Sequence, residues 1–248
     1  GIRADMDALP IQETTGLPYS SQLPGKMHAC GHDGHTAILL AAARSIAQDP
    51  QFDGTLNLIF QPAEEGLGGG RVMVEQGLFK LFPCDAIFAA HNMPGIPAGQ
   101  LVFIEGPAMA SSDDVTITLT GLGGHGAMPH LTQDPIIAAA SMVMALQTIV
   151  SRNVNPLQTA VITVGSLVAG KANNVIPNSA RLELSVRALD REVRDLLQAR
   201  ILALVSAQAE SLGVQAQIDY RRDYPVLVNT PAETKLARSV GVELLGQS

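Results

Sequence analysis

Met27-His-Ala-Cys-Gly-His-Asp-Gly-His35 places three histidines, one cysteine and one aspartate within nine residues. Imidazole, thiolate and carboxylate groups are the side chains that bind zinc and similar transition metals. The two glycines of the stretch allow tight backbone turns, so that neighbouring side chains can converge on one point. We therefore predict that this loop belongs to a metal site. The plainer alternative is a reactive-looking loop with a structural role.

Two more polar segments follow predicted strands farther along the chain. Glu64 and Glu65 come just after a strand predicted over 55–60. His91 directly follows a strand predicted over 86–90. Open α/β sheets bind ligands beyond the carboxyl ends of their strands. Each segment alone also fits a solvated acidic pair or a core histidine, but we expect both to join the histidine-rich loop at one sheet edge.

Helices separate the strands of this first half. The segment 36–48 is rich in Ala, Leu and Ile with a single charged residue, which predicts a buried helix. Asp33 or Thr36 is the predicted cap of this helix. A second, short helix is predicted over 69–76. Strands that alternate with helices in this way favour a mostly parallel α/β layer.

The adjacent glutamates suit a division of labour at a metal site. One carboxylate can bind metal, while the other takes a proton from a water molecule and hands it to a leaving amine. A bound divalent metal lowers the pKa of its water from ~15.7 toward ~7. Two metals ~3.5–4 Å apart can also hold a carbonyl oxygen and the attacking oxygen together. These residues therefore fit metal-assisted hydrolysis.

The composition predicts a folded chain and argues against several partners. Of the 248 residues, 46% are hydrophobic and 16% are charged, which is enough apolar material for one large core or two ordinary domains. The net charge of −7 argues against nucleic acid and anionic membranes as partners. No apolar run approaches the ~20 residues of a membrane span, and the longest candidate is 36–47. Cys30 and Cys84 make no disulfide framework, so a reduced thiol and a cytoplasmic protein are expected.

From about residue 112 the pattern changes to strands with one apolar face and two long helices. Asp134 and Asp190 are predicted to cap these helices. Strands are predicted over 115–119, 159–167, 181–187 and 214–220, and helices over 135–152 and 191–212. The order β-α-β-β-α-β indicates a ferredoxin-like layer, inserted as a separate domain. A last helix is predicted from Thr230-Pro231 onward.

One glycine-rich segment, Gly121-Leu-Gly-Gly-His-Gly126, formally fits a dinucleotide-binding pattern after a strand. Pro129 and His130 interrupt the helix that should follow, and no acidic residue lies about twenty positions on to contact a ribose. A nucleotide-binding module is therefore the weakest of the functions considered. His125 and His130 are left as polar residues of a glycine-rich loop, with solvent-exposed histidines as the plain alternative.

Six segments, taken in chain order, carry a family pattern over most of the sequence. They are Arg3-Ala-Asp-Met-Asp-Ala-Leu-Pro10, Met27–His35, Gln61-Pro-Ala-Glu-Glu-Gly66, His91-Asn-Met-Pro94, Gly124-His-Gly-Ala-Met-Pro-His130 and Asn173-Asn-Val-Ile-Pro177. Together they resemble the M20 metallopeptidases. Within that family they are similar to the amidohydrolase branch, which includes hippurate hydrolases and indole-acetyl-amino-acid hydrolases.

The resemblance implies two divalent metal ions per subunit, with manganese or zinc first and cobalt or nickel as alternatives. The implied metal ligands are Cys30, His32, Glu65 and His91. Cys30 would bridge the two ions in such a site. Glu64, next to one of the ligands, would then be the general base of the reaction.

The resemblance also implies supporting and substrate-binding residues. Asp7, together with Asp5, would orient the metal ligands. His125 would reach the active site of its own or the partner subunit and polarise the scissile carbonyl. Asn174 would help to hold the substrate, so that His125 and Asn174 form the substrate-binding pair.

The implied fold class is α/β. A phosphorylase/hydrolase-like catalytic α/β domain would cover 1–111, and an inserted ferredoxin-like α+β lid and dimerisation domain would cover 112–222. Residues 223–248 would return to the catalytic domain, and the lid would form a homodimer. The family carries one more histidine ligand in the returning part, whereas no histidine follows His130 here. We therefore expect an incomplete catalytic domain, truncated at this end.

The activity implied by the resemblance is hydrolysis of the amide bond of N-acyl amino acids, with hippurate-like or N-acetyl amino acid substrates. The nearest alternative is a dipeptidase or carboxypeptidase of the same superfamily, which would cleave substrates with a free α-amino group. An alternative of another class is an inactive dimerisation fragment that lacks the last metal ligand. We expect neither nucleic acid nor membrane among the partners.

Overall fold

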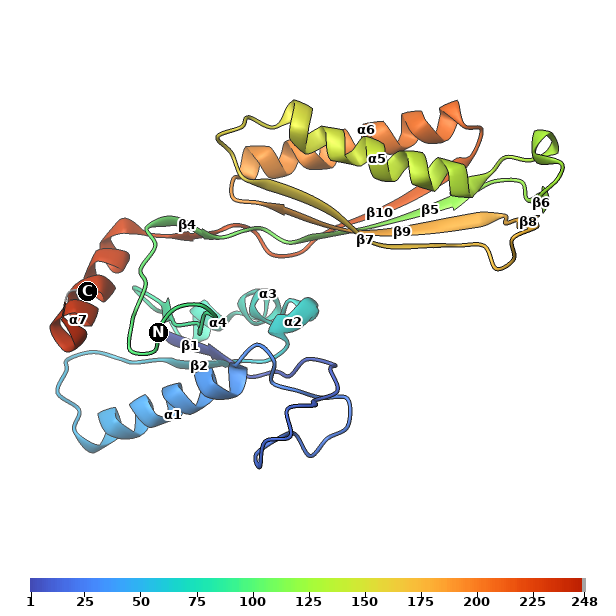
Figure 1. Cartoon of the computed structure of the whole chain (residues 1–248). Coiled ribbons are helices and arrows are strands. Elements are labelled where there is room, and N and C mark those ends of the chain that lie inside the picture. The colour runs from blue at the N-terminus through green and yellow to red at the C-terminus, as the bar shows by residue number, and fades with distance from the viewer. Residues whose placement is uncertain (247–248) are drawn as a thin grey trace. The chain divides into compact units, whose positions relative to one another are not determined.

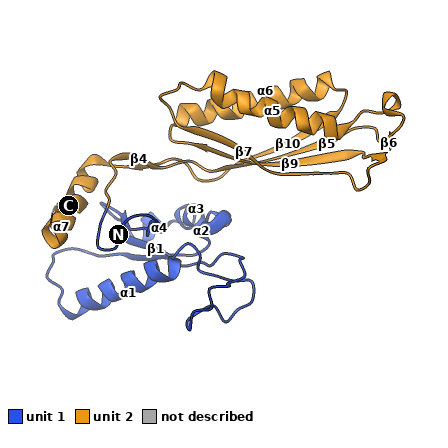
Figure 2. Cartoon of the chain, in the orientation of Figure 1, with its two compact units in different colours: residues 1–101, 247–248 blue, residues 102–246 orange. Residues whose placement is uncertain are grey.

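The computed structural model describes residues 1–246, which form two compact units (Figure 1 and Figure 2). The first unit comprises residues 1–101 and the second comprises residues 102–246. Both units mix helices with strands, so the chain is a mixed α/β protein as predicted. The domain limits predicted at residues 111 and 222 stay predictions, whereas the compact units divide at residue 101.

A three-stranded parallel sheet forms the centre of the first unit, with the strand order β2-β1-β3. Its strands are β1 (Ile2–Asp5), β2 (Leu58–Gln61) and β3 (Phe88–Ala89). The long helix α1 (His32–Gln48) packs against β1. The predicted parallel layer is thereby confirmed. Because the strands are parallel, their carboxyl ends share one edge of the sheet.

Helix α1 begins earlier than the sequence predicts. Its N-cap is Gly31, whose φ of 85° lies in the left-handed region that glycine adopts most readily. No side chain caps the helix, so the prediction that Asp33 or Thr36 would do so is wrong. The Thr36 hydroxyl instead donates to the backbone carbonyl of Asp5 at 3.0 Å, which ties the helix to β1.

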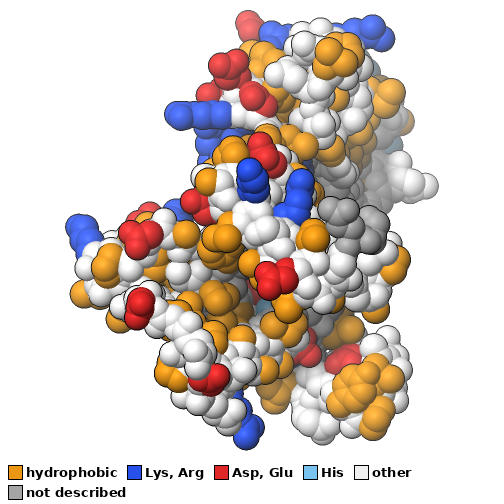
Figure 3. Space-filling view, turned by 90° about the vertical axis from the view of Figure 1, so that its left-hand side faces the viewer, with side chains coloured by type: hydrophobic (Ala, Val, Ile, Leu, Met, Phe, Trp, Pro, Cys, Tyr) orange, Lys and Arg blue, Asp and Glu red, His pale blue; other side chains and the backbone are white. Residues whose placement is uncertain are grey.

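The prediction that α1 is a buried helix is also wrong for most of its surface. Only His32, His35 and Leu39 are buried, and their spacing places them on one stripe of the helix. Ile38 and Leu40 are 66% and 56% exposed. An apolar composition suggests burial on all sides, whereas a three-stranded sheet covers only one side of a helix. Hydrophobic side chains are accordingly common on the molecular surface (Figure 3).

Three short helices follow β2, namely α2 (Glu64–Leu67), α3 (Gly69–Glu75) and α4 (Leu78–Leu81). Helix α3 confirms the short helix predicted over 69–76. The sequence does not predict α2 and α4, because a single turn leaves no periodic apolar pattern. Within α2, Glu65 has a non-helical ψ of 89°, so the turn is kinked at the glutamate pair.

The second unit contains a four-stranded antiparallel sheet in the order β10-β5-β9-β7. Two long helices, α5 and α6, lie side by side on one face of this sheet (Figure 1). The predicted order β-α-β-β-α-β is confirmed. The elements are β5 (Asp113–Thr120), α5 (Pro135–Asn153), β7 (Ala160–Ala169), β9 (Ser179–Ala188), α6 (Arg191–Ser211) and β10 (Gln215–Arg222).

The sheet and the two helices enclose a contiguous hydrophobic core. Ile117 and Leu119 of β5, Leu182 of β9 and Leu197 of α6 are completely buried in it. The residues between them on the strands are more exposed, so one face of the sheet is apolar and the other is polar. Burial of each large apolar side chain contributes about 1.5–3 kcal/mol relative to exposure. This layer is therefore stabilised mainly by apolar burial.

Both long helices of the second unit begin where the sequence predicts. The carboxylate of Asp134 accepts hydrogen bonds from the backbone N–H groups of Ile136 and Ile137, at 2.8 and 3.4 Å. Asp190 caps α6 in the same way, through the first N–H groups of that helix. Loss of such a cap typically costs about 1 kcal/mol of stability.

Helix α5 carries no charged residue from Pro135 to Ser151. Within the described residues it is the one helix that is long and apolar enough, by length and composition, to cross a membrane. The prediction that 36–47 is the longest apolar run is therefore wrong. The core accounts for one face of α5, where Met142 and Leu146 are buried between the helices and the sheet.

Several short strands escape prediction from the sequence. In the second unit β4 (Gly106–Met109) pairs with β11 (Leu227–Asn229), and β6 (Gly124–His125) pairs with β8 (Val175–Ile176). Strands of two to four residues leave too little alternation to detect. The predicted last helix is confirmed as α7 (Pro231–Leu245).

Candidate metal centre

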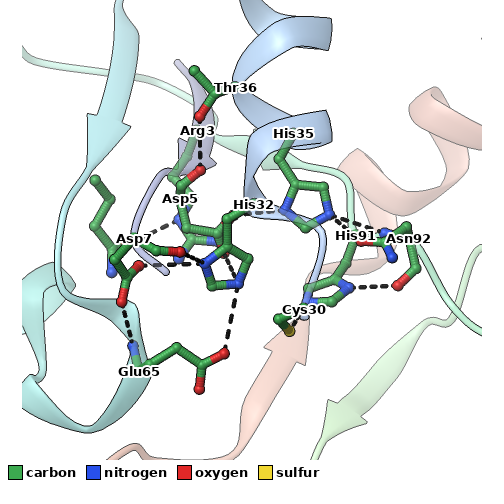
Figure 4. Close-up of polar contacts among 11 residues, drawn as sticks. Arg3, Asp5, Asp7, Cys30, His32, His35, Thr36, Glu65, His91 and Asn92 are labelled. Atoms are coloured by element: carbon green, nitrogen blue, oxygen red, sulfur yellow. Dashed lines mark hydrogen bonds and ion pairs between the residues drawn. The ribbon is translucent and has the colours of Figure 1, made fainter. Parts of the chain in front are cut away.

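Four segments of the first unit meet in one polar cluster (Figure 4). Each segment either follows the carboxyl end of a strand or opens a helix. Their side chains are Asp5 at the end of β1 and Asp7 just after it, Cys30 just before α1 and His32 at its start, Glu64 and Glu65 after β2, and His91 after β3. The parallel sheet explains the meeting, because it brings residues that are far apart in sequence to one edge.

Among the overlapping groups of possible metal ligands in the described chain, two contain the ligands predicted from the sequence. Cys30, His32 and His91 offer ligand atoms that all lie within 4.8 Å of one another. His32, Glu64 and Glu65 form a second group under the same limit. Because His32 belongs to both groups, the four ligands predicted from the sequence converge, with Glu64 beside them. Their role as ligands stays a prediction.

His32 fits a metal ligand because one of its ring nitrogens lacks a partner. The side chain is 1% exposed, and Nε2 has no hydrogen bond within the described chain. Nδ1 donates to the backbone carbonyl of Asp7 at 3.0 Å, so Nε2 keeps its lone pair, 3.9 Å from Glu65 Oε1. An unsatisfied buried acceptor costs about 1–3 kcal/mol. A bound cation would remove this cost.

His91 is arranged in the same way, although its side chain is exposed. Its Nδ1 donates to the backbone carbonyl of Asn92 at 2.7 Å. Its Nε2 therefore keeps a lone pair and lies 3.7 Å from Cys30 Sγ. Two histidines thus present Nε2 lone pairs beside a thiol and carboxylates, which is a donor set that zinc and related transition metals bind.

Burial and nearby negative charge change the acidity of two groups in the cluster. Burial raises the pKa of Cys30 to about 11, and the carboxylates of Glu65 and Glu64 add to this. The thiol is therefore protonated at neutral pH in the metal-free protein, and a metal must displace the proton to bind. Burial also raises the pKa of Glu64, with the charge of Glu65 as the next cause. A raised pKa suits a glutamate that exchanges protons near neutral pH.

Asp7 supports two of the predicted ligands. Its Oδ2 accepts a hydrogen bond from the backbone N–H of Glu65 at 3.0 Å, and its backbone carbonyl accepts one from His32. Burial alone would raise the pKa of Asp7, but the backbone N–H groups of Glu65 and Glu64 lower it below its usual value. This geometry supports the orienting role predicted for Asp7.

Asp5 is 1% exposed and anchors a buried polar network. It forms an ion pair with Arg3 at 2.8 Å, and Nδ1 of His35 donates to it at 2.6 Å. Burial alone would raise the pKa of Asp5, but the hydrogen bond from His35 and the charge of Arg3 lower it below its usual value. Asp5 is therefore a carboxylate at neutral pH and connects β1 to the start of α1.

The turn that presents the glutamate pair is tightly built. Ala63 has a φ of 55°, and it is the only residue other than glycine with a positive φ in the described chain. A non-glycine residue in this left-handed region costs about 1–2 kcal/mol. A Cβ at Gly69 would overlap the backbone oxygen of Pro62, so only glycine fits there. The fold therefore accepts local strain directly before Glu64.

His125 and Asn174, the predicted substrate-binding pair, lie together in the second unit. The backbone N–H of Gly126 donates to the carbonyl of Asn174 at 2.8 Å, where β6 and β8 pair. Both side chains are exposed. His130 lies in a single 3₁₀ turn, Pro129–Leu131, so the glycine-rich segment lacks the helix of a dinucleotide site. Contact of His125 with the metal ligands stays a prediction.

The sequence predicts no individual role at the site for His35 or Asn92, and it names Gly31 only as a turn residue, whereas the structure places all three in the cluster. His35 and Asn92 contact each other, and Gly31 allows Asn92 to approach. The signal for His35 is its position three residues after His32, which puts both on one helix face. The signal for Asn92 is only its position next to His91.

The fold and the cluster define a class of protein, namely a mixed α/β protein with side chains arranged to bind divalent metal. The chain belongs to peptidase family M20/M25/M40, and the family model matches residues 1–248. The resemblance to the M20 metallopeptidases, inferred above from six sequence segments, is thereby confirmed.

Two curated relatives show how much of a family member the chain covers. Hippurate hydrolase from Campylobacter jejuni is 47% identical over 247 residues, which are 100% of this chain and 64% of the relative. N-acetyl-L-cysteine deacetylase from Bacillus subtilis is 44% identical over 238 residues, which are 96% of this chain and 57% of the relative. The chain thus spans less than two thirds of the length of these relatives.

Solved structures resemble the chain over nearly its whole length. One from methicillin-resistant Staphylococcus aureus has a TM-score of 0.88 and 37% identity, and it covers 98% of this chain and 64% of its own. Another, from Bacillus subtilis, is described as a dinuclear metal binding peptidase from the M20 family. It has a TM-score of 0.77 and 36% identity, over 98% of this chain and 62% of its own.

Proposed function

We propose that the protein is a metal-dependent amidohydrolase that cleaves the amide bond of N-acyl amino acids. One observation carries the proposal: the buried, unpartnered Nε2 of His32 lies among a thiol, a second histidine and the paired carboxylates of Glu64 and Glu65. The relatives named above are a hippurate hydrolase and an N-acetyl-L-cysteine deacetylase, which supports this substrate class.

The metal ligands in this proposal are Cys30, His32, Glu65 and His91. A divalent ion at such a site lowers the pKa of a coordinated water toward ~7 and polarises a carbonyl oxygen. We propose two ions because a similar structure is described as dinuclear, and because thiol, imidazole and carboxylate donors of the cluster fall into more than one group of possible ligands. Thiolate and imidazole donors favour zinc, and carboxylates also accept manganese, so these two metals stand ahead of cobalt and nickel.

Glu64 is the proposed general base. Burial raises the pKa of Glu64 above that of a surface glutamate. The strained turn at Ala63 fixes the position of Glu64 after the end of β2. It takes a proton from the attacking water and returns it to the nitrogen of the leaving amino acid. Asp7 holds the backbone of Glu65 and the ring of His32 in place during the reaction.

The second unit is proposed to act as a lid that completes the site. In this proposal His125 polarises the scissile carbonyl and Asn174 holds the substrate. Two observations support these roles: both side chains are exposed, and the pairing of β6 with β8 holds their backbones together. A donor aimed at an oxyanion contributes about 3–4 kcal/mol to catalysis in well-studied enzymes.

We also propose that the protein forms a homodimer through the second unit. The outer face of α5 exposes Ile137 and Met144, at 57% and 73%. The edge strand β7 carries no charge over its ten residues and exposes Val168 at 65%. Natural proteins protect such edges with charges, prolines or a covering chain. A second copy of the same face would cover both features, because a two-fold contact is self-complementary.

Sedimentation measurements test the dimer. Met144→Glu and Val168→Glu together should convert the dimer to monomers, because like charges would be buried without partners in the interface. Leu157→Glu is the control, since Leu157 is 94% exposed in the loop between α5 and β7 and should not affect assembly. A chain that sediments as a monomer before any substitution would refute the dimer.

The function is tested by measuring metal content and hydrolysis on the same purified chain. We expect about two divalent ions per chain and release of the amino acid from hippurate or N-acetyl amino acids. Glu64→Gln should lower kcat about 10²–10⁴-fold with unchanged metal content, because the base is lost while the ligands remain. Cleavage of dipeptides alone would favour a peptidase. A metal-loaded chain that cleaves neither substrate would favour an inactive dimerisation fragment.

A further inference from the structure

We propose that His35 and Asn92 are positioning residues for the metal site. Together they form a bridge, the His35–Asn92 bridge, that fixes His91 relative to the start of α1, where Cys30 and His32 lie. The inference rests on the metal site proposed above. It concerns two side chains that are not ligands themselves, and it explains how ligands from separate segments keep one geometry.

The ring of His35 is 6% exposed and is held at both nitrogens. Nδ1 donates to Asp5 Oδ1 on β1 at 2.6 Å. Nε2 lies 3.1 Å from the backbone nitrogen of Asn92 and 2.5 Å from Oδ1 of its side chain. Depending on its protonation, Nε2 accepts from the backbone N–H or donates to Oδ1, and either bond ties His35 to Asn92. His35 therefore links β1, α1 and the segment after β3 in one line of contacts (Figure 4).

Gly31 lets Asn92 reach this position. It stands between Cys30 and His32 in the chain, and a Cβ built on it would lie 2.8 Å from Cγ of Asn92. Cβ atoms do not approach other heavy atoms so closely in proteins, so any residue other than glycine would displace the amide. The amide of Asn92 thus lies directly against the backbone that joins two predicted ligands.

The histidine rings pack against one another across the same junction. The centroid of the His35 ring lies 4.7 Å from that of His91, with the rings inclined at 65°, and 5.5 Å from that of His32. His91 follows a strand of only two residues and its side chain is exposed. Its position therefore depends on support from neighbouring segments, and the bridge supplies this support through the next residue in the chain.

A buried histidine beside metal ligands is itself a candidate ligand. Asp5, His32 and His35 do have ligand atoms within 4.8 Å of one another. The hydrogen bonds distinguish the two histidines, because both nitrogens of His35 are engaged. Nε2 of His32 makes no hydrogen bond in the described chain and lies near carboxylate oxygens of Asp5 and Glu65, at 3.6 and 3.9 Å. Residues that orient metal ligands from outside typically change metal affinity about 10–100-fold when they are replaced.

Titration of the full chain with Co²⁺ tests the bridge. Co²⁺ bound to a cysteine thiolate gives a near-ultraviolet charge-transfer absorption, so the titration reports both affinity and the bond to Cys30. We expect Asn92→Ala to weaken Co²⁺ binding about 10–100-fold. Leu39→Ala is the matched control, because Leu39 is buried one turn after His35 on the same helix but takes no part in the bridge. Thermal unfolding of each metal-free variant measures its stability separately.

Two substitutions of His35 separate its two contacts. In His35→Gln the side-chain amide can reach the position of Nε2, toward Asn92, whereas in His35→Asn it can reach only the position of Nδ1, toward Asp5. We expect the Co²⁺ affinity of His35→Gln to lie within about threefold of the wild-type affinity. We expect His35→Asn to bind Co²⁺ about 10–100-fold more weakly than the wild type. A merely structural histidine would give both variants losses that follow their stability.

The close approach of Asn92 to Gly31 gives an independent test. Gly31→Ala should weaken Co²⁺ binding more than Gly25→Ala does. Both glycines have a positive φ, 85° and 71°, but nothing lies within 4 Å of the Cβ position at Gly25. In an Asn92→Ala background the extra cost of Gly31→Ala should vanish, because the two residues are coupled through the contact that has been removed.

The outcomes separate this inference from the proposed function. If the wild-type chain binds no Co²⁺, the proposed metal site fails and the bridge fails with it. If the wild type binds Co²⁺ and the Asn92→Ala and His35→Asn variants bind it equally well, the metal site stands and the bridge is refuted. If every variant loses affinity only in proportion to its stability, as Leu39→Ala does, the bridge is refuted as well.

Discussion

The two units of the chain are stabilised by different kinds of burial. The second unit holds a contiguous apolar core, in which Ile117, Leu182 and Leu197 are fully buried. In the first unit the groups buried where β1 meets α1 include charged and polar side chains, Asp5 and His32 among them. A polar interior is stable only where its groups are paired. Burial in the first unit therefore mainly fixes the geometry of polar side chains, whereas burial in the second unit mainly stabilises the fold.

The second unit also buries a charged group beside its apolar core. Asp113 is completely buried and accepts hydrogen bonds from Arg194 Nε at 2.9 Å and from the Tyr220 hydroxyl at 2.8 Å. These three residues join the beginning of β5, the first turns of α6 and the end of β10. The group shows that a buried charge is tolerated in the stable unit as well, provided that its partners are present.

Removing the cation of this group should give the largest loss of stability. Arg194→Met should cost about 3–5 kcal/mol, because it leaves the Asp113 carboxylate buried without its partner. Arg181→Met is the control, since Arg181 is 56% exposed in its ion pair with Glu183 and should cost less than about 1 kcal/mol. Urea unfolding followed by circular dichroism measures both. Equal losses would show that the buried group does not stabilise the second unit.

Two matched leucines sharpen the contrast between the units. Leu182→Ala should cost about 3–4 kcal/mol, because its neighbours are held on all sides and cannot close the cavity. Leu39→Ala should cost less, about 2 kcal/mol, because only one side of α1 is covered and its surroundings can relax. Urea unfolding gives the totals, and hydrogen exchange assigns each loss to its unit. A larger loss at Leu39 would reverse the comparison.

The smallest expected effect depends on pH. Burial raises the pKa of Tyr220 above its usual value, and the hydrogen bond to Asp113 adds to this. Because the unfolded pKa is about 10, the neutral hydroxyl contributes fully below pH 10, and its contribution is lost as the pH rises toward the higher folded pKa. Tyr220→Phe should lower the free energy of unfolding by about 1.5 kcal/mol at pH 7. The variant should also lose less stability than the wild type as the pH rises above about 10.

Urea unfolding at a series of alkaline pH values measures this change. Tyr19→Phe is the control, because Tyr19 is 79% exposed in a loop of the first unit and should leave the pH profile of the wild type unchanged. An alkaline profile of Tyr220→Phe that coincides with that of the wild type would show that the hydroxyl does not couple folding to pH.

Parts of the molecule that repeat a simple pattern could be predicted from the sequence. The alternation around Val115 and Ile117 predicted β5, and the aspartate before α6, Asp190, predicted where that helix begins. The convergence of three site segments followed from one rule, that ligands gather beyond the carboxyl ends of parallel strands. These features depend on residues that are neighbours in the chain or on the order of the elements.

The rest depends on contacts between segments, which leave no local signal. The residue that precedes α1 must be glycine, because its φ is positive and an amide from Asn92 occupies the space where a side chain would lie. The burial of α1 depends on the width of the neighbouring sheet, and the amino-acid composition of the helix does not reveal that width. The role of His35 appears only once Asp5 and Asn92 are seen on its two sides.

Strand β7 has a further consequence for newly made chains. Its segment Val161-Ile-Thr-Val-Gly-Ser-Leu-Val168 is rich in β-branched side chains and contains no charge and no proline. Such segments on an open sheet edge recruit strands from other molecules and seed fibrils. An uncovered β7 edge would therefore make newly made chains prone to aggregation.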